Sequence, residues 1–80
     1  MEQKIKNVVA QAMGARDGED NRTDQLFRSL EEAGFPVSEA DSRECSAVDP
    51  SILAVLTDGR AVYVQREDLP QGDPGRYRII

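Results

Sequence analysis

The stretch of sequence that decides the fold is residues 52–65, ILAVLTDGRAVYVQ. Two runs of apolar and β-branched residues flank Asp58-Gly59, a dipeptide preferred in two-residue type I′ turns because both residues tolerate a positive φ. The stretch therefore predicts a β-hairpin within residues 51–66. The turn also predicts which residues oppose one another: Val55 with Val62 and Leu53 with Val64 on one face, and Leu56 with Ala61 and Ala54 with Tyr63 on the other.

Both faces of this predicted hairpin are apolar. A hairpin with one face in water would alternate apolar with polar residues. We therefore expect a cover over the second face, supplied either by other parts of the chain or by a second copy.

A third strand is expected at the end of the sequence. Residues 69–75, LPQGDPG, have the composition of turns, and Arg76–Ile80, RYRII, then alternate polar with apolar residues. This alternation predicts a strand that returns antiparallel to the hairpin.

Upstream of the hairpin, residues 2–13 predict an amphipathic helix. Gly14 lies where a left-handed residue would end this helix, and residues 15–20 are polar and predict a loop. The apolar stripe of the helix follows helical spacing and consists of Ile5, Val8, Val9, Ala12 and Met13.

A second helix is expected from residue 21 or 22 to Ala33, because Asp20 and Asn21 are both suitable N-caps. Asp24 adds a negative charge to its first turn, where the helix dipole favours one. The loop between the two helices is short, which favours an antiparallel αα-hairpin.

The end of the second helix has a clear signature. Gly34 fits the left-handed residue of a Schellman motif, and Phe35 is then placed to fold back on Leu30. Pro36 prevents the helix from continuing.

Residues 36–50 follow no clear period. A short strand near Phe35–Ser38 and a short helical turn near Glu39–Cys45 are both open. The sequence as a whole predicts a single α+β domain over residues 1–80. Its two N-terminal helices, an αα-hairpin, pack on a small antiparallel β-meander in the order ααβββ.

The composition is unfavourable to catalysis. The chain has no histidine and a single cysteine, Cys45, so it cannot build a disulfide of its own, a zinc site or a nucleophile–histidine pair. Residues 17–28 fail the EF-hand template, because Arg22 and Arg28 stand where a glycine and a glutamate are required. We expect no enzymatic activity and no cofactor.

The expected location is the cytoplasm. A single thiol suits a reducing compartment, and the first residues lack the pattern of a signal peptide. No stretch approaches the ~20 apolar residues that a membrane-spanning helix needs.

Negative charge is concentrated in the middle of the sequence. Residues 17–49 hold ten acidic residues against three arginines, a balance of −7, whereas residues 1–16 balance to +2 and residues 51–80 to zero. Such a block repels nucleic acid and attracts basic partners, although acidic surfaces also serve solubility alone. Part of it is expected to be neutralised on the second helix, where Arg28 lies four residues from both Asp24 and Glu32.

We therefore expect the protein to dock on a basic protein, such as one that binds nucleic acid, and to inhibit it by occluding its nucleic-acid groove. Small acidic proteins of phages and mobile elements, including anti-CRISPR and other counter-defence proteins, offer an analogy of size and charge. The candidate partner-binding residues are Asp17, Glu19, Asp20, Asp24, Glu31, Glu39, Asp41 and Glu44.

Two alternatives belong to other classes. A winged-helix-like or sheet-based regulator could bind nucleic acid through four arginines of the β half, but a net charge of −5 makes direct binding to nucleic acid unfavourable. A structural or assembly subunit could bury the second hairpin face in a homodimer. The arginines are Arg60, Arg66, Arg76 and Arg78, and they are expected to balance Asp58, Glu67, Asp68 and Asp73.

Overall fold

The protein was analysed as a computed structural model that describes residues 1–14 and 22–80. Three helices precede three strands, and the strands form one antiparallel sheet in the order β1-β2-β3. The predicted α+β class is confirmed, with one helix more than the two expected. The elements are α1 (Glu2–Gly14), α2 (Arg22–Glu32), α3 (Glu39–Val48), β1 (Ile52–Val55), β2 (Ala61–Val64), the 3₁₀ turn η1 (Pro74–Arg76) and β3 (Tyr77–Ile79).

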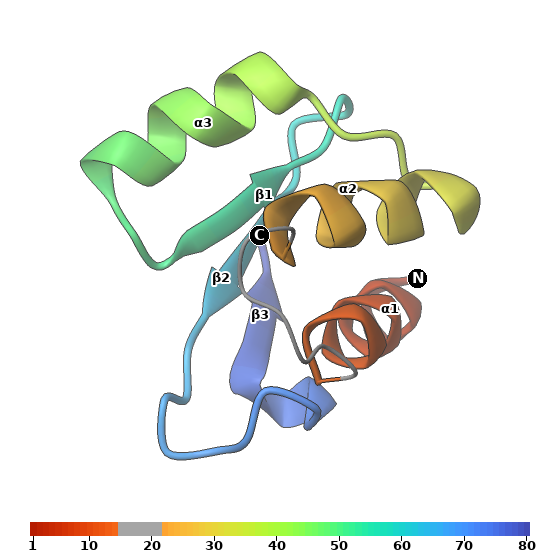
Figure 1. The fold of residues 1–80 in the computed structure, drawn as a ribbon, viewed down its shortest axis with the longest axis vertical. Helices are drawn as coiled ribbons and strands as arrows, with labels where there is room; N and C mark the ends of the chain where they lie inside the picture. Colours follow the sequence, from red (N-terminus) through yellow and green to blue (C-terminus); the bar gives the residue numbers. More distant parts are fainter. Residues whose placement is uncertain (15–21) are drawn as a thin grey trace.

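The core lies between α1 and α2 on one side and the sheet on the other (Figure 1). Ile5 and Leu30 are fully buried from the helix side, and Ala54, Val62 and Tyr77 are fully buried from the sheet side. The Tyr77 hydroxyl donates a hydrogen bond to the Gln71 carbonyl, so the long loop before β3 is tied to this core. The helices on one face of a small meander are the arrangement that the sequence predicts.

The hairpin turn differs from the prediction. The Gly59 N–H donates to the Leu56 carbonyl (3.0 Å) and the Leu56 N–H to the Arg60 carbonyl (2.7 Å), so the loop has three residues. Gly59 has a φ of 96°, whereas Asp58 is not among the described residues with positive φ. This is the pattern of a type I turn followed by a left-handed glycine, and the predicted type I′ turn is wrong.

The extra loop residue shifts the register by one. Ala54 pairs with Val62 and Val55 with Ala61, and an irregularity in β1 lies between Ile52 and Ala54. A one-residue slip exchanges the faces, so the predicted facing pairs are wrong. Ala54 and Val62 face the helices and are fully buried.

The opposite side of the sheet carries Val55, Ala61, Tyr63, Arg78 and Ile80, which we call the outer sheet face. Val55, Ala61 and Tyr63 are half-buried, and Ile80 is 61% exposed. α1 and α2 lie together beside the other side of the sheet, and α3 runs beside β1 (Figure 1). Among the described residues no helix stacks on the outer sheet face, and a second copy as its cover stays a prediction.

Residues 36–50 contain both of the structures that the sequence leaves open. Val37 forms a β-bridge with Leu56, and α3 begins two residues later. The Ser38 N–H donates to the Val55 carbonyl (2.8 Å), and the Val55 N–H donates to the Ser42 hydroxyl oxygen (2.8 Å). The Ser42 hydroxyl donates in turn to the Ser38 carbonyl (2.7 Å). The outer edge of β1 is therefore paired at Val55 with the chain just before it.

The predicted end of α2 is confirmed. Gly34 has a φ of 95°, the Phe35 N–H donates to the Leu30 carbonyl (2.8 Å), and the Gly34 N–H donates to the Glu31 carbonyl (3.1 Å). These two bonds define a Schellman motif. Phe35 and Leu30 are both buried. The predicted N-cap of α2 at Asp20 or Asn21 lies outside the described residues.

Gly14 is not the left-handed residue that the sequence predicts. It is the last residue of α1, and the described glycines with positive φ are Gly34 and Gly59. A β-carbon on Gly14 would lie 2.5 Å from the Gly72 α-carbon. The glycine is therefore needed because α1 touches the backbone of the loop before β3.

Candidate acidic docking surface

Three of the predicted partner-binding residues meet around one hollow. Asp24 and Glu31, seven residues apart on α2, and Glu39 in the first turn of α3 line it together with Phe27 and Arg28. We call this the acidic hollow; its volume is about 250 Å³. The Schellman turn brings the start of α3 beside α2, because it reverses the chain directly after α2. The lining holds three carboxylates and one guanidinium, and Glu39 also pairs with Arg43 on α3 (3.6 Å), which leaves a surplus of one negative charge.

The other predicted residues are not gathered there. Asp41 and Glu44 are exposed on α3 and do not line the acidic hollow. Asp17, Glu19 and Asp20 lie outside the described residues. The structure therefore brings together Asp24, Glu31 and Glu39 out of the predicted set.

The predicted neutralisation on α2 differs from what the structure contains. Within residues 1–14 and 22–80, Arg28 forms no ion pair with Asp24 or Glu32. Glu39 pairs instead with Arg43 (3.6 Å), and both side chains are more than half exposed. An exposed pair of this kind contributes little to stability and is readily exchanged for another partner.

A groove with a mixed apolar and polar lining adjoins the acidic hollow. It lies between α2, α3 and β1, has a volume of about 630 Å³ and shares Asp24 and Phe27 with the hollow. We call it the α2–α3 groove. The sequence does not indicate this groove, because a short helical turn near Glu39–Cys45 was one of two structures left open and α3 has no apolar stripe to signal it. Its lining is Met13, Asp24, Leu26, Phe27, Ser42, Arg43, Ser46, Ala47, Ile52 and Leu53.

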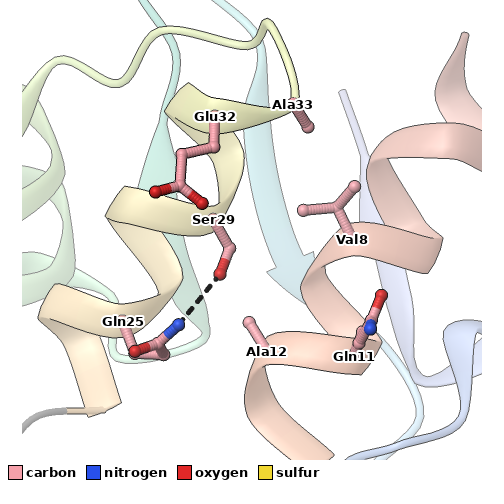
Figure 2. A pocket seen from close by; sticks show the side chains of 7 residues that line it. All are labelled: Val8, Gln11, Ala12, Gln25, Ser29, Glu32 and Ala33. Atoms are coloured by element: carbon pink, nitrogen blue, oxygen red, sulfur yellow. Dashed lines mark hydrogen bonds between the residues drawn. The ribbon is translucent and has the colours of Figure 1, made fainter.

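A second groove runs between α1 and α2 (Figure 2) and has a volume of about 600 Å³. Short or uncharged side chains dominate it, and its one charged residue is Glu32. The Gln25 side-chain amide donates to the Ser29 hydroxyl (3.3 Å) across one turn of α2. Figure 2 shows the side chains that line it: Val8, Gln11 and Ala12 from α1, and Gln25, Ser29, Glu32 and Ala33 from α2.

The ionisable groups with displaced pKa values lie elsewhere. The Ser51 hydroxyl and N–H donate to the Asp49 carboxylate and lower its pKa. A paired hydrogen bond from Arg66 lowers the pKa of Asp68 and raises that of Arg66. These groups are fully exposed and form local contacts. In the described part of the chain, no three side chains of the metal-binding types gather into a site.

The arginines of the β half are largely occupied by their own loops. Arg60 pairs with Asp58 (3.2 Å) and Arg66 with Asp68 (2.6 Å), which confirms the predicted balance for these two acids. Arg76 donates to the Glu67 carbonyl (3.1 Å) and to the Leu69 carbonyl.

Arg78 stays exposed on the outer sheet face beside the half-buried Tyr63, whereas Tyr77 is buried. The β half therefore does not present its arginines and tyrosines as one platform for nucleic-acid bases.

Comparisons with protein-family models, with curated proteins and with solved structures gave no match for this chain. Over residues 1–14 and 22–80, no helix is both long and apolar enough to span a membrane.

Proposed function

We propose that the protein is a non-enzymatic interaction protein that docks on a basic protein through the acidic hollow and the neighbouring exposed faces of α2 and α3. The observation that carries the proposal is the convergence of Asp24, Glu31 and Glu39 around one hollow with a negative surplus. Exposed Asp41 and Glu44 extend the same charge along α3. A field of one sign steers an oppositely charged partner toward the surface and speeds association.

The partner that fits this surface best is a nucleic-acid-binding protein, whose basic groove the acidic side chains would occupy in place of phosphates. Occupying the groove makes the protein an inhibitor, in the manner of the counter-defence proteins of phages and mobile elements. Size, a net charge of −5 and the engaged arginines of the β half support this assignment over direct binding to nucleic acid.

The proposal is tested by quantitative capture of partners from a bacterial host lysate across a salt series. The bait variant D24N/E31Q/E39Q removes the charge of the acidic hollow. The control variant E2Q/E67Q/D68N removes three exposed acids elsewhere. We expect a basic nucleic-acid-binding protein to be captured at low salt by the wild type and the control, and to be lost with the first variant.

Capture of the same basic protein by all three baits, with no dependence on salt, would contradict the proposal. The acidic block would then serve solubility.

A second candidate function rests on the outer sheet face. A largely apolar face, on which Ile80 is 61% exposed beside Arg78, favours a structural or assembly subunit that pairs with a second copy. The two candidates use different surfaces, so the oligomeric state tests the second one independently.

A further inference from the structure

The acidic hollow and the α2–α3 groove are neighbours with different chemistry. They share Asp24 and Phe27, and Phe27 is 5% exposed, so its ring forms a wall common to both. One side of this wall carries three carboxylates. On the other side most of the apolar residues come from α1, α2 and β1, and α3 adds the polar Ser42, Arg43 and Ser46.

At the bottom of the α2–α3 groove, the buried residues Ser42, Leu26 and Phe27 need no hydrogen bond from an occupant. Ser42 is 1% exposed, and its hydroxyl is already engaged with the Ser38 carbonyl and the Val55 N–H. Leu26 and Phe27 are also buried there. An apolar side chain packed over Ser42 would therefore displace water without leaving the Ser42 hydroxyl unpaired.

The charges around the groove and the hollow determine where a cationic group of a partner would bind. In the groove lining Asp24 and Arg43 balance one another, whereas the lining of the acidic hollow has three carboxylates against Arg28, so a cation is favoured in the hollow over the groove. The groove volume of about 630 Å³ falls in the range of roughly 300–1,000 Å³ that is typical of ligand pockets.

We infer that the basic partner docks with an apolar anchor side chain in the α2–α3 groove and a neighbouring lysine or arginine in the acidic hollow. This inference rests on the proposed function and adds the anchor to it. Interfaces commonly derive most of their affinity from a few apolar or aromatic anchors in pockets, while surrounding charges provide specificity and a fast encounter. The occupant is thus a segment of a basic protein that combines both groups, and not a uniformly charged one.

The test uses short synthetic peptides of alternating lysine and glycine with a single central residue, which is phenylalanine, leucine or alanine. Binding is followed by NMR of the ¹⁵N-labelled protein. We expect the phenylalanine and leucine peptides to bind about tenfold more tightly than the alanine peptide. The largest amide shifts should occur at Phe27, Ala47 and Leu53.

Two protein variants separate the parts of the site. Ala47→Gln places a longer neutral side chain at the exposed lip of the groove, and Ala40→Gln makes the same change at an exposed position of α3 outside it. We expect A47Q to remove the advantage of the phenylalanine peptide and A40Q to leave it intact. E31Q/E39Q should weaken all three peptides.

The outcomes distinguish the inference from the proposed function. Equal affinity for the phenylalanine and alanine peptides, still reduced by E31Q/E39Q, would overturn the anchor and leave the acidic docking surface standing. Affinity that is unaffected by E31Q/E39Q would overturn both.

Discussion

At the scale of single residues, Ser42 connects α3 to β1 through its hydroxyl. Among the residues that the structure describes, Ser42 is the polar residue buried in the core. Its hydroxyl oxygen accepts a hydrogen bond from the Val55 N–H on the outer edge of β1. Replacing the hydroxyl by a hydrogen leaves this N–H without a partner in a place that water does not reach. The desolvation cost of an unpaired buried donor is about 1–3 kcal/mol.

We therefore expect Ser42→Ala to lower the free energy of unfolding by about 1–3 kcal/mol, measured by urea denaturation. The control is Ser46→Ala, one turn later on α3, where the side chain is half-buried and forms no hydrogen bond with a described residue. The control should change stability by less than about 0.5 kcal/mol. Equal effects of the two substitutions would contradict this role of Ser42.

Gly14 gives a second prediction at this scale. Alanine normally favours a helix over glycine by about 1 kcal/mol. Here its β-carbon would lie 2.5 Å from the Gly72 α-carbon, a contact with backbone that no rotamer relieves. Overpacking typically costs about 1–3 kcal/mol, so we expect a net loss of stability from Gly14→Ala in a thermal melt.

The partner glycine provides the control. A β-carbon on Gly72 would lie 3.7 Å from the Gly14 α-carbon, an ordinary van der Waals contact. Gly72→Ala should therefore melt close to the wild type. A G14A protein that is more stable than the wild type would show that the loop before β3 simply moves away.

At the scale of elements, the hairpin turn makes a prediction that separates two turn types. In the three-residue loop only Gly59 needs a positive φ, whereas a type I′ turn would need one at Asp58 as well. Gly59→Ala should therefore cost about 1 kcal/mol. Asp58→Ala should cost less, because it removes only the exposed bond from the Arg60 N–H and the exposed pair with Arg60. Chemical denaturation of both variants is the measurement, and a larger loss for Asp58→Ala would favour the type I′ turn.

The elements also show which parts of the fold were predictable from the sequence. The end of α2 was predictable, because Leu30, Gly34 and Phe35 interact locally and need no distant residue. The hairpin was predicted correctly but its register was not, because Asp-Gly occurs in both two-residue and three-residue loops. The Thr57 N–H also bonds to the Pro36 carbonyl, a partner outside the hairpin that the local sequence does not indicate.

α3 was left open for a different reason. Its buried residue is Ser42, which packs by hydrogen bonds to β1, and no periodic apolar stripe marks such a helix. The candidate docking surface stays a prediction. Charge alone singled out Asp24, Glu31 and Glu39, which the structure places around one hollow, but the groove beside them depends on how α3 packs against β1.

At the scale of the whole molecule, the charged and the neutral parts present different surfaces. The acidic hollow belongs to the part of the sequence with a balance of −7, and the outer sheet face to the part that balances to zero. Two copies of an acidic chain repel one another least where they carry no net charge. A homodimer would accordingly form through the outer sheet face and leave the acidic hollow open to a partner.

The register determines which variant tests this homodimer. Leu56 is 3% exposed on the helix side, so Leu56→Asp should unfold the protein and gives no information on association. Tyr63→Lys changes a half-buried residue of the outer sheet face instead. If the face is a dimer contact, sedimentation should give a dimer for the wild type and a monomer for Y63K, with the same circular dichroism. A monomeric wild type at high concentration would exclude this contact.

The pairing of Val55 on the outer edge of β1 affects how two molecules can join through their sheets. Sheet edges are templates for aggregation, and an open-ended fibre needs two of them on every subunit, one to receive a strand and one to offer the next. Here the Ser38 N–H already donates to the Val55 carbonyl and the Val55 N–H to the Ser42 hydroxyl, so β1 cannot also pair with a strand of a second molecule at this residue. Edge pairing is thereby blocked at the end of β1 nearest the hairpin turn, which weakens one of the two templates that an open-ended fibre needs.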